Sequence, residues 1–242
     1  MRTKPLHFLP MIGIAFLVAS CSASSSTASN SSTVSRLISK SQNAVQSAGS
    51  VHFVDITQIG KTDKTLTGDI GPTAAQEVLT ESGVPTLQVR FVSNTVYLLT
   101  SSTSVLQFTL ELAPATAQVQ TNKWISLTAS DKPYAAITQS LSITSALSIY
   151  FPTSTATAKI GATRTVGGIK VIPVTGTSNP QKNVSAETTV FIAAATSLPA
   201  AGTLAAKTSS GSESKQGIFR SWGVPVSVEA PAGSTPYSSI IG

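Results

Sequence analysis

Cysteine and histidine are the side chains that most often supply a nucleophile, a general base or a zinc ligand, and this sequence contains three of them: His7, Cys21 and His52. His7 lies inside an apolar segment near the N-terminus, and Cys21 directly follows that segment. If the segment is removed, His52 is the sole histidine of the mature chain. One histidine and one cysteine cannot make a Cys/His zinc site, and they exclude most nucleophile–base pairs.

The N-terminus has the composition of a secretory signal. Arg2 and Lys4 form a positive region, and an apolar segment from Leu6 to Ala19 follows, broken by Pro10 and Gly13. This segment is shorter than the ~20 apolar residues that a helix needs to span a bilayer. The pattern therefore favours a removable signal peptide over residues 1–20.

The residues around Cys21 indicate what replaces the signal. Positions 18–21 read Val-Ala-Ser-Cys, which resembles the lipobox of bacterial lipoproteins. In that motif the cysteine receives a diacylglyceryl thioether before cleavage ahead of it. Two acyl chains, of the palmitate type, give stable anchoring where one chain is marginal. The alternative is an ordinary secretory signal, with Cys21 as an unmodified cysteine. Residues 21–32 are rich in Ser, Thr and Ala, and we expect a lipidated flexible tether there.

The charge balance excludes several partners. Loss of Arg2 and Lys4 would leave 14 Lys and Arg against 10 Asp and Glu, a net charge of +4. No run of four or more basic residues marks a nucleic-acid site. Only 11% of the residues are charged, and Ser, Thr, Ala and Val are abundant, which is typical of a secreted β-rich protein. The remaining length favours one domain over residues 33–242.

Acidic residues could bind a metal or act in catalysis, but their spacing favours neither role. They alternate with apolar and hydroxyl residues in a strand region and lack the spacing of a calcium loop. We interpret them as a solvated face of a sheet; they are Asp55, Asp63, Asp69, Glu77 and Glu81. His52 opens a strand pattern, and no Gly-x-Ser-x-Gly elbow accompanies it. The sequence therefore predicts no catalytic site, no metal site and no cofactor.

The first half of the domain predicts a helix followed by a meander. Ser32 or Thr33 can cap a helix that ends at Gly49; its apolar face consists of Val34, Leu37, Ile38, Val45 and Ala48. From Ser50 the apolar period becomes two, with turn signals that include Gly60 and Gly71-Pro72. Alternation and tight connections predict antiparallel strands.

The second half interrupts the strands with apolar helical segments. Residues 105–112 look helical before Pro114 ends them, and a strand follows at Lys123-Trp124-Ile125. A second helix is expected over residues 138–151, with Pro152 stopping it. Gly167-Gly168 marks the strongest hairpin signal. Further strands are expected around residues 188–192, 217–219 and 224–228.

This order of elements is similar to that of the LolA-like lipoproteins of the LppX and LprG type. The resemblance covers about residues 33–232 and rests on Lys123-Trp124-Ile125, Gly167-Gly168, Leu198-Pro199 and a Ser-Trp-Gly-Val-Pro-Val run at 221–226. It implies an α+β fold: a curved antiparallel sheet, an unclosed half-barrel, covered by α-helical insertions that enclose a cavity for acyl chains. It implies no catalytic motif.

An acyl chain needs a dry concave wall, and strand and helix residues of this sequence can form one. The expected cavity residues are Val89, Phe91, Val96, Leu98, Leu106, Leu110, Leu141, Leu147 and Tyr150. The leading hypothesis is a non-enzymatic lipoprotein, anchored on the extracytoplasmic side of the cell membrane, that binds or carries lipids or lipoglycans in a bacterial envelope. The alternative is an envelope interaction or sensing module whose core is filled. An enzyme such as an esterase is a third class, without a matched base and acid.

Overall fold

A computed structural model describes residues 25–181, 184–208 and 211–241. The expected signal peptide and Cys21 lie outside these residues. The helices are α1 (Ser25–Ala48), α2 (Thr103–Thr109), α3 (Pro114–Gln120), α4 (Tyr134–Ser140), α5 (Ile143–Ser148) and α6 (Ser238–Ile241). The strands are β1 (Val51–Ile59), β2 (Thr62–Ile70), β3 (Ala74–Glu81), β4 (Val84–Val92), β5 (Thr95–Thr100), β6 (Ile125–Leu127), β7 (Lys159–Ile160), β8 (Arg164–Val166), β9 (Ile169–Gln181), β10 (Val184–Ala193), β11 (Pro199–Thr208), β12 (Gly211–Arg220) and β13 (Thr235–Pro236).

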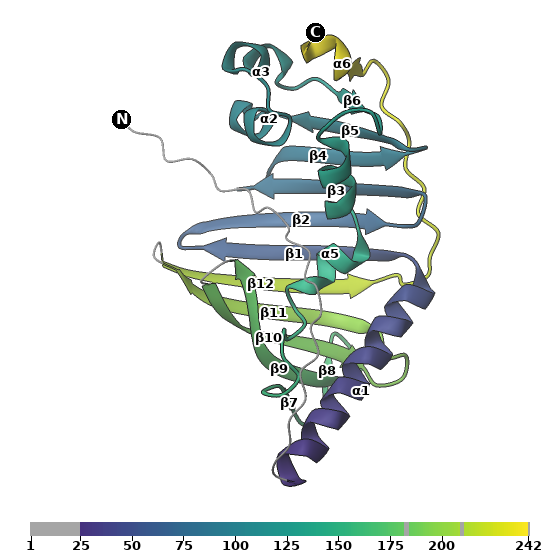
Figure 1. The fold of residues 1–242 in the computed structure, drawn as a ribbon, viewed down its shortest axis with the longest axis vertical. Helices are drawn as coiled ribbons and strands as arrows, with labels where there is room; N and C mark the ends of the chain where they lie inside the picture. The colour runs from purple at the N-terminus through teal and green to yellow at the C-terminus, as the bar shows by residue number, and fades with distance from the viewer. Residues whose placement is uncertain (1–24, 182–183, 209–210, 242) are drawn as a thin grey trace.

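The described strands form one curved sheet of 13 strands that does not close into a barrel (Figure 1). Two meanders, β1 to β6 and β9 to β12, join where β1 pairs with β12. Every pairing among these strands is antiparallel except that of β13 with β6. Tight hairpins make this topology possible. Gly60 and the pair Gly167-Gly168 adopt the positive φ angles that glycine tolerates best, which confirms both predicted hairpins.

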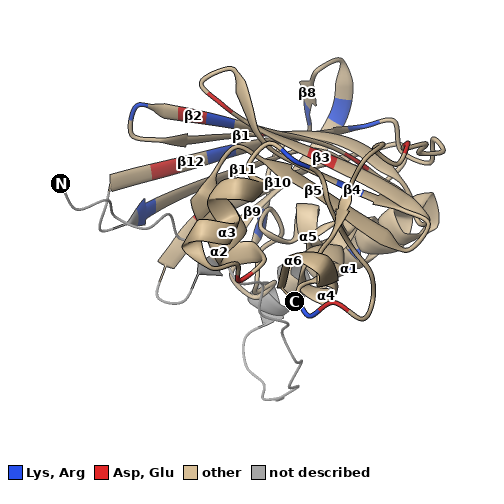
Figure 2. Ribbon diagram, turned by 90° about the horizontal axis from the view of Figure 1, so that it is seen from above, with Lys and Arg blue, Asp and Glu red and all other residues tan. Residues whose placement is uncertain are grey.

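All six helices lie on one side of the sheet, as Figure 2 shows for the described chain. The concave face of the sheet and the inner faces of the helices share one apolar core. In α1 the buried side chains of Val34, Ile38 and Val45 fall on one face, as the sequence predicts. The α+β half-barrel covered by helical insertions is therefore confirmed.

Three predicted helix boundaries are wrong. Helix α1 begins at Ser25 rather than after Ser32 or Thr33, so residues 25–32 continue a helix where a tether was expected. Pro114 starts α3 instead of only ending the segment before it, because proline fits the first helical position, where no backbone donor is required.

The third error concerns the expected helix over residues 138–151. The chain instead forms α4 and α5, with a break at Leu141 and Ser142. Ser142 adopts an extended conformation, and its side chain accepts a 3.1 Å hydrogen bond from the backbone N–H of Ser145. A serine cap of this kind starts a new helix, since it satisfies a free N–H group at the helix end. The two short helices cross the strands in succession (Figure 1).

Candidate functional site

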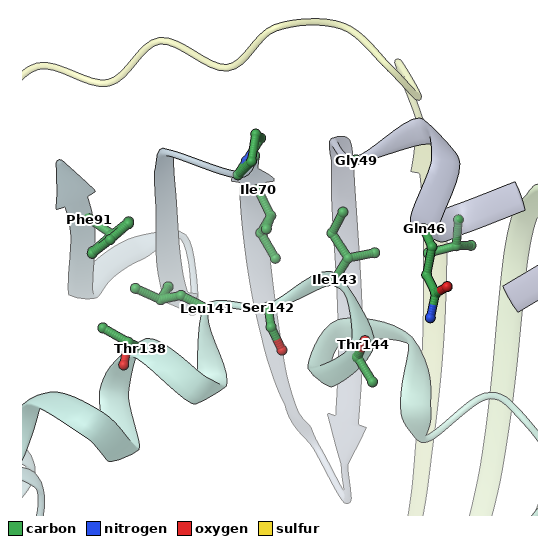
Figure 3. A pocket seen from close by; sticks show the side chains of 12 residues that line it. Gln46, Gly49, Ile70, Phe91, Thr138, Leu141, Ser142, Ile143 and Thr144 are labelled. Atoms are coloured by element: carbon green, nitrogen blue, oxygen red, sulfur yellow. The ribbon is translucent and has the colours of Figure 1, made fainter. Parts of the chain in front are cut away.

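A pocket of about 380 Å³ lies where the junction of α4 and α5 faces the sheet and the end of α1. Its apolar wall includes Ile70 and Phe91 from the strands and Leu141 and Ile143 from the junction (Figure 3). Polar groups also line it: Gln46, Thr138, Ser142 and Thr144. The volume falls at the lower end of the ~300–1,000 Å³ typical of ligand pockets. An apolar floor with polar groups suits an amphiphile better than a fully polar ligand.

Local backbone features create this pocket. Helix α1 ends at Ala48, and the following Gly49, with a φ of 70°, turns the chain away and leaves open space where a side chain would stand. The turn at Gly71-Pro72 connects β2 to β3 on the opposite wall. The break at Ser142 separates α4 from α5 and brings Leu141 and Ile143 toward the strands. A continuous helix would not present both side chains in this way.

The nine expected cavity residues gather on the inner side of the sheet, but most of them fill the core. Eight are buried within the main apolar cluster, and Phe91 packs against it partly buried. Only Phe91 and Leu141 line the pocket described above. Several lining residues are not among the nine expected ones: Val45, Gln46, Gly49, Ile70, Ser142 and Ile143. Their apolar members were visible in the sequence as parts of amphipathic elements, whereas the hollow depends on how those elements dock.

Tyr150, just after α5, is fixed in a notch of the sheet. Gly202 of β11 and Gly217 of β12 pair with each other. A Cβ atom at these glycines would come within 2.4 Å and 2.8 Å, respectively, of the Tyr150 ring. The ring also makes an edge contact with Phe219, with centroids 5.6 Å apart. Only glycine at both positions allows the aromatic ring to lie this close to the backbone.

Two hydrogen bonds hold the same segment. The Tyr150 hydroxyl donates to Asp55 Oδ1 at 2.8 Å, and the Thr188 hydroxyl donates to the Tyr150 carbonyl oxygen at 2.9 Å. Farther along, Pro152 packs against Gly176, where a Cβ atom would stand 2.8 Å from the proline ring. The end of α5 is therefore attached to the strands β1, β9, β10, β11 and β12.

Asp55 and Glu77 correct the expectation of a solvated acidic face. Asp55 is only 5% exposed, on the same side of β1 as the buried Val51 and Phe53. Glu77 is half-buried on the same concave face, because it pairs in register with Gly68, over which the Phe53 ring lies. The parity of β1 and the cross-strand register place both carboxyl groups inside the fold.

Burial sets the protonation of these two groups. Loss of hydration raises the pKa of Asp55 to about 6, although the Tyr150 hydrogen bond and the positive charge of Lys215 favour its carboxylate. Burial raises the pKa of Glu77 to about 7, and the negative charge of Asp55 adds to this. Burial and the neighbouring Asp55 raise the pKa of Tyr150 above its usual value, so its hydroxyl keeps its proton. The inner face therefore holds two carboxyl groups that titrate near neutral pH.

The opposite face of the sheet carries His52. Its Nδ1 lies 2.7 Å from Asp69 Oδ1, and its Nε2 lies 3.2 Å from Arg220 Nη2. Since arginine can only donate, Nε2 accepts and Nδ1–H donates to Asp69. Burial would raise the pKa of Asp69, but hydrogen bonds from Gln76 and His52 hold it below its usual value. With both ring nitrogens engaged, His52 is positioned as a structural residue, beside a second hollow of about 300 Å³.

Residues 25–181, 184–208 and 211–241 contain no group of three or more His, Cys, Asp and Glu side chains that could hold a metal ion. Within the same residues, no helix has the length and apolar character required to cross a membrane.

Comparison with solved structures identifies the fold. The chain is similar to the lipoprotein LppX of Mycobacterium tuberculosis, with a TM-score of 0.52 and 18% identity over 82% of this chain and 99% of that chain. An uncharacterized conserved protein of Thermus thermophilus follows, with a TM-score of 0.42 and 6% identity over 84% of this chain and 98% of that chain. A LolA superfamily protein of Nitrosomonas europaea has a TM-score of 0.26 and 9% identity over 74% of this chain and 91% of that chain. No protein-family model and no curated protein matches the sequence. The likeness to LppX confirms the LppX-type, LolA-like fold predicted from the sequence.

Proposed function

We propose that this chain is a lipoprotein that binds or carries lipids in the extracytoplasmic part of a bacterial envelope, attached to the membrane through Cys21. The apolar segment before Cys21 and the small residues at positions 18–20 support the anchor. The LppX-type fold supports the envelope location, because LppX is itself described as a lipoprotein. The ligand would be an acylated lipid or lipoglycan, and the role would be non-enzymatic.

The pocket beneath the junction of α4 and α5 is the observation that carries the binding proposal. Its floor is built from Ile70, Phe91, Leu141 and Ile143, which present apolar surface to a hollow of about 380 Å³. Burial of ~200 Å² of acyl surface would gain ~5 kcal/mol before the cost of immobilising the ligand. A hollow of this size holds part of one acyl chain. A diacylated ligand would require α4 and α5 to move away from the sheet.

The alternative, an interaction module with a filled core, has its own supporting observation. Seven of the nine expected cavity residues are packed in the core and do not line the pocket. In that case the outer face of the sheet would be the functional surface; it carries partly exposed Ile56 and Ile218. The two functions differ in one measurable property, the uptake of lipid.

A lipid uptake experiment separates them. The full chain carrying Cys21→Ser is mixed with phosphatidylglycerol vesicles that contain a pyrene-labelled phosphatidylglycerol, and transfer to the protein is followed by fluorescence. Ile143→Trp fills the pocket and should reduce uptake at least ~5-fold. Ile218→Trp adds the same bulk at a side chain that is 39% exposed on the other face, and it should leave uptake unchanged. No uptake by the parent chain, or equal loss in both variants, would favour the filled module.

A further inference from the structure

The end of the molecule where α1 begins carries an edge of the sheet that is basic and partly apolar. We call it the basic edge and define it by five side chains of β7, β8 and β9: Lys159, Ile160, Arg164, Ile169 and Lys170. All five are exposed, with Ile160 at 38% and Ile169 at 45%. Figure 1 shows this edge near the first turns of α1, at the opposite end of the molecule from α3 and α6.

The three cations of the basic edge have no acidic partner. Among the described residues none of them forms an ion pair, and the sequence has no Asp or Glu within residues 1–54 or 132–186. On the adjoining strand β10 the acid is Glu187, which pairs with Thr177. Thr177 lies ~23 Å along β9 from Lys170, more than twice the ~8 Å Debye length of physiological salt. The described part of the chain therefore leaves this positive charge without a neutralising group.

Arg164 is held in place at this edge by an aromatic ring. Its guanidinium lies over Phe191, 4.6 Å from the ring centroid, and Phe191 belongs to a small apolar cluster with Val171 and Ala201. The ring fixes the cation, while the exposed N–H groups can donate to phosphate oxygens in pairs. Phosphate is the group that a lipid headgroup presents, and exposed isoleucine side chains suit the boundary between headgroups and acyl chains.

The proposed lipid anchor is close to the same end. Three residues separate Cys21 from Ser25, where α1 begins, so the connection can span at most ~14 Å. The helix rises ~15 Å from Ser25 to Ser35, whose hydroxyl donates a 3.0 Å hydrogen bond to the hydroxyl of Thr155, just before β7. Cys21 therefore lies within about 30 Å of Thr155, whereas the sheet extends ~50 Å from β7 to β13.

We propose that the basic edge docks on the anionic surface of the membrane that holds Cys21, with β7, β8 and β9 against the bilayer and α2, α3 and α6 away from it. This inference rests on the proposed anchor and deepens it by assigning the orientation of the protein. The anchor raises the concentration of the edge at the headgroups. There the cations attract anionic lipid, and the isoleucines contact the acyl boundary.

Vesicle binding tests the edge separately from the anchor. The full chain carrying Cys21→Ser is sedimented with phosphatidylcholine vesicles, of which one set contains one quarter phosphatidylglycerol. Each lysine near an anionic surface strengthens binding by ~5-fold, so Lys159→Gln/Lys170→Gln should weaken binding to the anionic vesicles by ~10-fold or more. Lys61→Gln/Lys123→Gln removes the same charge at exposed positions in the β1–β2 turn and before β6, and should change affinity by less than ~2-fold. Residues 1–20 are common to all variants.

The orientation is measured on the anchored protein. Because acylation blocks the thiol of Cys21, Thr165→Cys in β8 provides a single site for a fluorescent label, and Gln118→Cys on α3 is the matched control at another exposed position. The labelled proteins are reconstituted into the anionic vesicles together with a lipid that carries a nitroxide on its headgroup. The nitroxide should quench the label at position 165 and leave the label at position 118 unchanged. Replacing Lys159 and Lys170 by glutamine should reduce the quenching at position 165.

Two results would overturn the docking inference: equal affinity of the two double variants for anionic vesicles, or equal quenching at positions 165 and 118. Either would leave the basic edge to a protein partner. The anchor can fail separately, because the vesicle comparison uses protein without the acyl chains. If the intact mass of the mature wild-type protein shows an unmodified Cys21 while Lys159→Gln/Lys170→Gln still weakens vesicle binding, the anchor is rejected and the membrane contact of the edge is upheld.

Discussion

The hydroxyl of Tyr150 donates a 2.8 Å hydrogen bond to the carboxylate of Asp55, and the two residues lie 95 positions apart in the sequence. This bond connects the helical cover to the first strand of the sheet. It also places a buried acid at the end of the segment that borders the pocket. Stability and its pH dependence are therefore expected to depend on the same pair.

Stability should fall as the pH rises, in contrast to proteins whose carboxylates are stabilised by partners. The pKa values of Asp55 and Glu77 are raised in the folded state, from ordinary values of 3.8 and 4.5. Protonation therefore favours folding: the gain is complete below about pH 4 and is lost by about pH 7. Urea unfolding should give a free energy of unfolding ~1–3 kcal/mol higher at pH 5 than at pH 8.

Neutral replacements should remove this dependence. Glu77→Gln and Asp55→Asn keep the shape of the side chain but cannot ionise, so the double variant should be more stable than the wild type at pH 8 by ~1–3 kcal/mol. The advantage should shrink toward pH 4, where both wild-type groups are protonated. Unfolding curves at both pH values check this. Parallel pH profiles for the two proteins would show that these carboxyl groups are hydrated in the folded state.

Gly202 and Gly217, which form the Tyr150 notch, should tolerate no side chain. Gly202→Ala would place a methyl group 2.4 Å from the Tyr150 ring, which must then move. We expect a loss of ~1–3 kcal/mol in the free energy of unfolding, typical of overpacking in a close-packed interior. Ser214→Ala, at an exposed position of β12, is the control and should change stability by less than ~0.5 kcal/mol. A Gly202→Ala protein as stable as the control would mean that the Tyr150 ring is not held against the strand.

Cys21 should determine where the protein resides. Two acyl chains on this residue would hold the mature chain in the membrane fraction, since each buried methylene contributes ~0.8 kcal/mol. Cys21→Ala should yield an uncleaved or a released form, which can be separated by membrane fractionation and intact-mass measurement. Finding the unmodified thiol of Cys21 in the mature wild-type protein would contradict the anchor.

The sequence predicts the sheet better than it predicts the site, and the reason is physical. Alternation and glycine turns are local, so the hairpins at Gly60 and Gly167-Gly168 could be read from neighbouring residues. The sequence also indicates the inward position of Asp55, because Asp55 alternates along the strand with Val51 and Phe53 and so lies on the same face. The sequence does not indicate the Tyr150 notch, because the notch requires Gly202 and Gly217 to pair and α5 to end above them.

The pocket depends on packing at still longer range. The expected cavity residues are apolar side chains on facing elements, and such residues line a core and a ligand cavity equally well. Their burial places them on the inward side, but whether a void remains depends on helix placement. The break at Ser142 governs the placement of α4 and α5. The only sign of this break in the sequence is the preference of serine, here Ser142, for the N-cap of a helix.

Native mass spectrometry of the full chain carrying Cys21→Ser, with organic extraction of any bound lipid, tests lipid binding most directly. We predict a species heavier than the polypeptide by the mass of an acylated lipid, lost on extraction and reduced in Ile143→Trp but not in Ile218→Trp. A mass equal to the polypeptide alone, both as purified and after incubation with phosphatidylglycerol at pH 8, would contradict the account and favour a filled interaction module.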